Sequence, residues 1–180
     1  MAYKQGQRRG RIWADVQLID RLINEIDFVD TGQKESDFAR IVSTALKITQ
    51  GFHGEIISEQ SQGVTVPTIR IFGPAHRPDL SVHDDGIAIE LKLIGTETGI
   101  KTAIGQAHFY RVRYRFVVNL IILKREKREL YLGAARGEEE FFHAICRDLS
   151  LTKNIFTYIV PAFKVPDDVP RVLAWNDVLD

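Results

Sequence analysis

An almost wholly apolar run at residues 116–123, FVVNLIIL, constrains the fold more than any other segment of this chain. It is too short to cross a bilayer as a helix, and Asn119 interrupts it. Runs of this length are typical of strands that are covered on both faces of a sheet. We therefore expect a soluble protein in which helices cover a sheet that contains this buried strand.

Four segments carry apolar residues at helical spacing, namely 11–28, 33–49, 99–115 and 138–149. Short β-prone runs separated by Gly, Pro and Asp-Gly signals lie at 54–60, 68–73, 77–84 and 86–94, and further strands are predicted at 129–135 and 155–160. This order predicts an α/β fold with a mixed central sheet flanked by helices. The length of 180 residues is that of one domain, and we expect residues 1–180 to form one.

Composition limits the classes of function. The 24 basic and 24 acidic residues give no net charge, so no global field attracts nucleic acid. Basic residues do gather between positions 101 and 128, although a solvated face would have the same composition. Cys146 is the only cysteine, which excludes an internal disulfide, and the N-terminus lacks the apolar core of a signal peptide. We expect a cytoplasmic protein with no membrane partner.

The segment RPDLSVHDDGIAIELKL, residues 77–93, contains the strongest hairpin signal of the chain. An Asp-Gly pair such as Asp85-Gly86 suits a tight turn, because both central positions of that turn need positive φ. Directly paired strand residues point to the same face of a hairpin. A turn at this pair therefore places four polar side chains on one face: Asp79, Ser81, Glu90 and Lys92.

In that register Asp79 and Glu90 are diagonal neighbours. Two carboxylates at this separation repel each other unless a proton or a cation offsets their charge. A hard divalent cation such as Mg²⁺ would bind both carboxylates and still accept phosphate oxygens at its open positions. Lys92 would then lie where negative charge develops on a phosphate under attack. The alternative is a surface cluster of salt bridges, which would contribute little to stability.

Two predicted helices add polar residues. Glu35 lies three residues before Phe38, at the N-terminal end of an apolar stripe, and we expect it to point toward the sheet. A carboxylate there also stabilises a helix N-terminus, which is the alternative explanation. On the helix after the hairpin, a polar stripe at i, i+4 and i+7 could contact a phosphate backbone, although a solvated face would look the same: Gln106, Tyr110 and Arg113.

Together these residues resemble the PD-(D/E)XK nuclease superfamily, the restriction-endonuclease-like fold with an αβββαβ core. Pro78-Asp79 followed by Glu90-Leu91-Lys92 matches its signature, and Gln106 with Tyr110 is similar to the Q-h-x-x-Y element of the RecB-like branch. The resemblance covers residues 33–125 as a catalytic core. It leaves residues 1–30 as an N-terminal helical extension and residues 126–180 as C-terminal additions.

The resemblance implies a site and a cofactor. Asp79, Glu90 and the carbonyl of Leu91 would bind Mg²⁺ or Mn²⁺, with Glu35 completing the set of ligands. Glu59 competes with Glu35 for that role. Lys92 would orient the attacking water or stabilise the transition state, and Gln106 would position the nucleic acid or the lysine. We expect contacts with nucleic acid from five further residues: Ser81, Lys101, Tyr110, Arg111 and Arg113.

Two functions follow from these patterns. The first is a metal-dependent nuclease that hydrolyses phosphodiester bonds, with DNA as the expected substrate and RNA as an alternative. The second is a nucleic-acid-binding or scaffolding subunit that keeps the fold without turnover. A homodimer is a further expectation, because enzymes that cut both strands of a duplex often dimerise.

Overall fold

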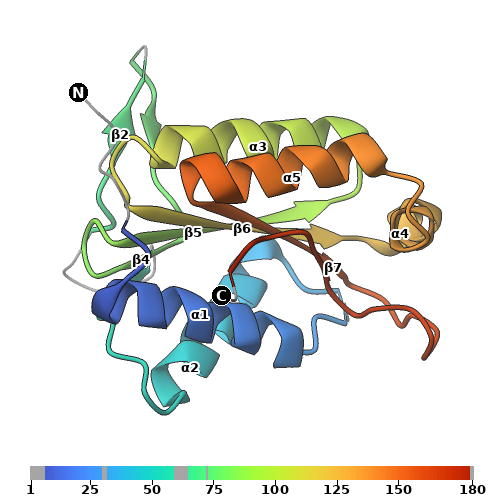
Figure 1. Ribbon diagram of the computed structural model, residues 1–180, viewed down its shortest axis with the longest axis horizontal. Coiled ribbons are helices and arrows are strands. Elements are labelled where there is room, and N and C mark those ends of the chain that lie inside the picture. The colour runs from blue at the N-terminus through green and yellow to red at the C-terminus, as the bar shows by residue number, and fades with distance from the viewer. Residues whose placement is uncertain (1–6, 30–31, 59–64, 72, 179–180) are drawn as a thin grey trace.

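Helices cover both faces of one sheet in the computed structural model, which describes residues 7–29, 32–58, 65–71 and 73–178 (Figure 1). Helices α1 (Gly10–Glu25) and α2 (Glu35–Ile48) lie on one face, and α3 (Glu97–Tyr110) and α5 (Glu140–Lys153) lie on the other. A 3₁₀ turn (Arg125–Lys127) and the short helix α4 (Arg128–Ala135) follow at one end of the sheet. The prediction of a sheet flanked by helices is confirmed.

The sheet has six strands in the order β1-β4-β5-β6-β7-β8. Its strands are β1 (Ile56–Ser58), β4 (Leu80–Val82), β5 (Ile87–Ile94), β6 (Phe116–Leu123), β7 (Ile155–Pro161) and β8 (Leu173–Ala174). The central pairs β5–β6 and β6–β7 are parallel and the other pairs are antiparallel, so the sheet is mixed. Strands β2 (Ile69–Arg70) and β3 (Ala75–His76) form a separate hairpin.

Strand β6 is buried along its whole length, as its apolar run predicts. On the face covered by α1 and α2, Val118, Leu120 and Ile122 pack in a cluster with residues of these two helices. On the face covered by α3 and α5, Val117 and Ile121 contribute to two further clusters, which include residues of α3, α4 and α5. Alternate residues of one strand therefore fill two separate apolar layers.

The prediction of a strand at 129–135 is wrong, because these residues belong to helix α4. Tyr131 and Ala134, three positions apart, are both buried, and the Tyr131 ring packs edge-on against Phe163. Over seven residues the apolar pattern fits a period of two as well as a period of 3.6. Packing against the segment after β7 selects the helix.

The predicted tight turn at Asp85-Gly86 is also wrong. Leu80 pairs with Ile89, Ser81 with Ala88 and Val82 with Ile87, so the connection spans residues 83–86. His83 and Asp84 adopt the left-handed conformation, with φ values of 56° and 57°. This register differs from the predicted one by two residues, which leaves the same side chains on the same face.

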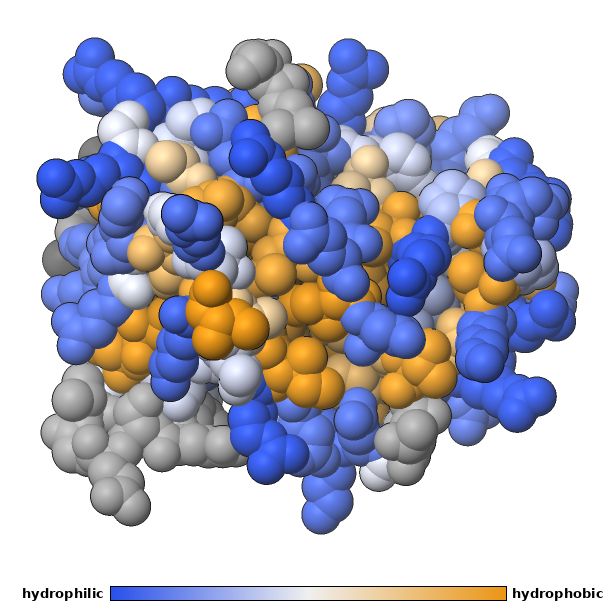
Figure 2. All heavy atoms as spheres, turned by 90° about the horizontal axis from the view of Figure 1, so that it is seen from below, coloured by the Kyte–Doolittle hydropathy of each residue, from blue (hydrophilic) through white to orange (hydrophobic). Residues whose placement is uncertain are grey.

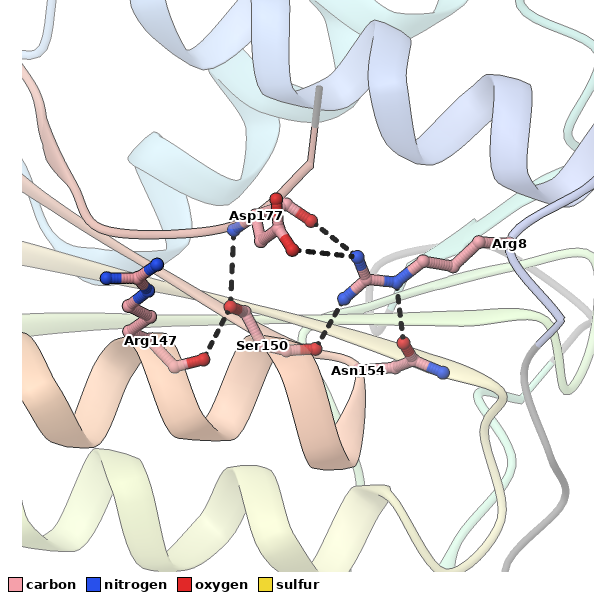
Figure 3. A network of polar contacts seen from close by, with 5 residues as sticks. All are labelled: Arg8, Arg147, Ser150, Asn154 and Asp177. Carbon is pink, nitrogen blue, oxygen red and sulfur yellow. Dashed lines mark hydrogen bonds and ion pairs between the residues drawn. The ribbon is translucent and has the colours of Figure 1, made fainter. Parts of the chain in front are cut away.

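The N-terminal segment and the C-terminal segment meet at the end of α5 (Figure 3). The Arg8 guanidinium donates to the carbonyl oxygens of Ser150 at 2.6 Å and Asp177 at 2.7 Å, and to Oδ1 of Asn154 at 3.2 Å. It also lies over the rings of Trp13 and Phe156. Arg8 therefore binds the last turn of α5 and the C-terminal segment together.

The face that carries α1 and α2 exposes apolar atoms at its centre, between polar side chains (Figure 2). Leu22 of α1 and Ile41 of α2 are partly buried and pack against the core cluster, and Ile48 of α2 is 81% exposed. None of the helices in the described part of the chain is long and apolar enough to span a membrane.

Candidate active site

The C-terminal half of β5 extends beyond β4, and the carboxylates of Asp79 and Glu35 lie along the edge that β4 leaves uncovered. Strand β4 begins at Leu80, which pairs with Ile89 of β5, so no residue of β4 pairs with residues 91–94. The Leu91 N–H donates to Oδ2 of Asp79 at 2.7 Å, and the Leu93 N–H donates to Oε2 of Glu35 at 2.9 Å. Alternate residues of a strand present their N–H groups to the same edge, so Asp79 and Glu35 lie on one side of β5.

Lys92 connects the carboxylates of Glu35 and Glu90. Its Nζ atom lies 3.0 Å from Oε1 of Glu35 and 3.0 Å from Oε1 of Glu90. The Glu90 side chain is 3% exposed, whereas Lys92 is 24% and Glu35 34% exposed. The site therefore has a buried floor at Glu90 and opens to solvent at Lys92 and Glu35. The structure brings four predicted residues together: Glu35, Asp79, Glu90 and Lys92.

Burial controls the charge of this site. Desolvation and the nearby Asp79 carboxylate raise the pKa of Glu90 from 4.5 to about 7, although Lys92 and Tyr110 act in the opposite direction. Burial lowers the pKa of Lys92, but the carboxylates of Glu90 and Glu35 outweigh it and the net shift is upward. Lys92 is therefore a permanent cation next to a carboxyl group that titrates near neutral pH.

Helix α3 supplies a second layer of polar groups. The Tyr110 hydroxyl donates to the carbonyl of Arg77 at 2.8 Å. Gln106 lies one turn earlier on α3, and its Oε1 atom is buried without a hydrogen-bond partner among the described residues. Tyr110 thus links α3 to the segment that precedes Asp79, while Gln106 holds an acceptor that α3 itself does not satisfy.

Three residues predicted to contact nucleic acid are buried instead: Ser81, Tyr110 and Arg111. The Ser81 hydroxyl donates to the carbonyl of Asp84 at 2.6 Å, within the connection that follows β4. Arg111 donates to the carbonyls of Lys153 and Tyr114, which ties the end of α3 to the end of α5. These side chains organise the interior, so a role as direct contacts does not fit their positions.

The remaining predicted residues divide between surface and undescribed positions. Lys101 is exposed on α3, and Arg113 is half-buried, 3.9 Å from Asp84 across an ion pair. Glu59, the alternative to Glu35, lies outside the described residues. Glu35 is the upstream carboxylate that the described part of the chain brings to the site.

Sequence reasoning missed Asn119. This residue of β6 pairs with Glu90 of β5 and with Thr157 of β7, so the three form a row across the sheet. It is fully buried, and neither atom of its amide has a hydrogen-bond partner within the described ranges. A polar residue within an otherwise apolar strand could have indicated a functional position. Its place beside Glu90 could not be predicted, because it depends on the register between β5 and β6.

The oxygen atoms of the site are chemically suited to a hard cation, but Lys92 occupies part of the space. Asp79 and Glu90 offer carboxylate oxygens, and the Leu91 carbonyl lies on the same edge of β5 as its N–H, which bonds Asp79. Within the described residues, no three His, Cys, Asp or Glu side chains are arranged to hold a metal. Burial is the larger cause of the raised pKa of Glu90 and the Asp79 carboxylate the smaller one, and a divalent cation between the two carboxylates would relieve only their repulsion.

Comparisons with protein-family models, with curated proteins and with solved structures found no match to this chain. The functional argument therefore rests on the chemistry and geometry of the site.

Proposed function

We propose that this protein is a metal-dependent nuclease that hydrolyses phosphodiester bonds, with DNA as its substrate. The observation that carries the proposal is the convergence of Asp79, Glu90 and Lys92 at one edge of β5, with Glu35 beside them. The order of α2, β1, β4, β5, α3 and β6 along the chain supports a restriction-endonuclease-like core, because it reproduces the αβββαβ sequence of elements.

Each residue of the site has its own role in hydrolysis. Asp79, Glu90 and the Leu91 carbonyl would hold Mg²⁺ or Mn²⁺, with Glu35 as a further ligand. When bound, the ion supplies an activated water and polarises the scissile phosphate. Lys92 provides a fixed positive charge for the negative charge that develops in the transition state. Gln106 orients the phosphate or Lys92, and the exposed Lys101 and the half-buried Arg113 hold the nucleic-acid backbone.

Lys92 also offsets negative charge within the site. Its single positive charge lies 3.0 Å from Oε1 of both Glu35 and Glu90 and offsets part of the repulsion among these two carboxylates and Asp79. When a cation binds, Lys92 would exchange these carboxylates for a phosphate oxygen. The same side chain would thus balance charge in the resting site and contact the substrate in the loaded one.

A cleavage assay tests the proposal. Labelled single-stranded, duplex, flapped and four-way-junction DNA, and RNA, are incubated with Mg²⁺ or Mn²⁺ and with the wild-type protein or the variants Lys92→Ala and Asp79→Ala. We expect metal-dependent cutting of DNA, reduced at least about 100-fold in both variants. Lys47→Ala, an exposed lysine in the last turn of α2, is the matched control and should cut normally.

The assay also identifies the alternative function. Binding of nucleic acid without cutting of any substrate would contradict the nuclease and favour a non-catalytic binding or scaffolding subunit. Cutting that survives in Lys92→Ala would contradict the assignment of the site.

A further inference from the structure

Asn119 lies in the middle of β6, between apolar residues. It is 0% exposed, and so are Val117 and Ile121, its neighbours on the same face of the strand. Neither Oδ1 nor Nδ2 of its amide has a hydrogen-bond partner among the described residues. An unpaired buried amide destabilises a folded protein, and departures of this kind from good packing are expected at functional sites. The amide of Asn119 therefore indicates a role other than folding.

Glu90 is one of the two polar residues that pair with Asn119 across the sheet, and Thr157 of β7 is the other. The pairing places the side chains of Asn119 and Glu90 on the same face of two strands that lie about 4.8 Å apart. Rotation of the two side chains is enough to bring Nδ2 to a carboxylate oxygen. A hydrogen bond to a carboxylate is stronger than one to a hydroxyl group, so an ionised Glu90 is the favoured partner.

In this structure Lys92 is the charged donor to Glu90, with 3.0 Å between Nζ and Oε1. Our proposed function requires Lys92 to leave this carboxylate for a phosphate oxygen when a cation and the substrate bind. Glu90 is 2% exposed, so water does not replace the lost donor easily. The Nδ2 group of Asn119 is the donor beside Glu90 that the described part of the chain leaves unused.

We propose that Asn119 is a positioning residue, which replaces Lys92 as the hydrogen-bond donor to Glu90 when a divalent cation binds. Its amide would then fix the orientation of a carboxylate that serves as a metal ligand. Hydrogen bonds to such ligands contribute about 10- to 100-fold to metal affinity in other proteins. The inference rests on the proposed function, because it takes Glu90 as a ligand of the ion. It also explains why the amide is unpaired while Lys92 holds Glu90.

Titration calorimetry with Mn²⁺ at pH 8 tests this role in the wild type, Asn119→Val and Asn119→Thr. Valine and threonine have the same shape, but only threonine keeps a donor. We expect Asn119→Val to bind Mn²⁺ at least about 10-fold more weakly than the wild type, and Asn119→Thr to recover part of the loss. Without metal, Asn119→Val should unfold at a higher urea concentration than the wild type. A purely structural residue would not separate affinity from stability in this way.

Thr157→Val is the matched control. Thr157 is 1% exposed and lies on the side of Asn119 away from Glu90, so the variant removes a buried hydroxyl group without changing the shape of the side chain. It should bind Mn²⁺ as the wild type does. An equal loss of affinity in Thr157→Val and Asn119→Val would overturn the inference, because the effect would then belong to buried polar groups in general.

Three further results would also overturn it. The first is unchanged Mn²⁺ affinity in Asn119→Val beside a wild type that binds, which would leave the proposed function intact. The second is a threonine variant that binds no better than the valine variant. The third is destabilisation of the metal-free protein by valine, since the amide would then already be bonded. A wild type that binds no Mn²⁺ is a different result, because it contradicts the proposed function and this inference together.

Discussion

At the scale of single residues, the carboxyl group of Glu90 makes the stability of this protein depend on pH. Its pKa is raised from 4.5 to about 7, so the folded state retains a proton that the unfolded chain has already lost. The stabilisation from this proton is complete below pH 4.5 and is lost as the pH rises to about 7. The free energy of unfolding should fall over this range by at most about 3 kcal/mol from this group.

The variant Glu90→Gln isolates this effect, because an amide does not titrate. Urea unfolding between pH 4.5 and pH 8 should show a smaller decrease in stability for Glu90→Gln than for the wild type. Glu129→Gln, whose side chain is 83% exposed on α4, should follow the wild-type curve. Parallel curves for wild type and Glu90→Gln would show that Glu90 is already ionised in the folded protein at acidic pH.

Arg8 is the second residue with a predictable effect. Its guanidinium donates three hydrogen bonds to three acceptors in the structure, a geometry that the point charge of lysine does not reproduce (Figure 3). We expect Arg8→Lys to lower the free energy of unfolding by about 2 kcal/mol, measured by urea denaturation. Arg9→Lys is the control, because Arg9 is exposed and bonds Gln7 nearby in sequence. Equal effects at both positions would mean that the contacts with α5 do not stabilise the fold.

At the scale of elements, β6 contains a polar residue that its neighbours do not satisfy. Asn119 is fully buried and both atoms of its amide lack partners within the described part of the chain. Replacing an unsatisfied buried amide by an apolar side chain removes its desolvation penalty. Asn119→Val should raise the free energy of unfolding by about 1 kcal/mol, and Asn119→Asp should lower it by several, because it places a charge beside Glu90. Destabilisation by valine would show that the amide is hydrogen-bonded in solution.

The same scale shows why the proximity of these residues could be predicted although the hairpin turn was not. The side-chain period of a strand is two residues, so the two-residue error in register kept Ser81, Glu90 and Lys92 on one face, and Asp79 reaches the same part of β5 through the Leu91 N–H. The turn itself depends on a contact distant in sequence, between the His83 ring and Asp15 of α1. An Asp-Gly pair carries no information about α1, and local patterns alone therefore favoured the tighter turn.

Burial was harder to predict than position. Tyr110 belongs to the predicted polar stripe and Arg111 was a predicted contact with nucleic acid, yet both are buried because α3 ends against the segment before β4 and against the end of α5. The helix at 128–135 depends likewise on the packing of Tyr131 against Phe163. Each of these outcomes is decided by the relative placement of two elements, which the period of one element does not encode.

At the scale of the whole molecule, the proposed metal site joins three segments of the chain. Glu35 comes from α2, Asp79 from the segment before β4, and Glu90 from β5, so their geometry exists only in the folded protein. A cation that binds only the folded state stabilises it by RT ln(1 + [L]/Kd), or about 2.7 kcal/mol at 100 times Kd. For a chain of this length, that corresponds to an increase in Tm of roughly 5 to 10 °C.

This stabilisation by metal should depend on pH through Glu90. Below the pKa of about 7, binding must displace a proton, so the affinity falls up to tenfold for each pH unit. With Mn²⁺ at a fixed concentration, scanning calorimetry should therefore show a larger increase in Tm at pH 8 than at pH 5. Asp79→Asn keeps an acceptor for the Leu91 N–H but loses a charged ligand, and it should abolish the increase, whereas Glu129→Gln should not. An equal increase in Tm at both pH values in the wild type and both variants would mean that the metal binds elsewhere. No increase in Tm at either pH would mean that these carboxylates bind Lys92 and no metal ion.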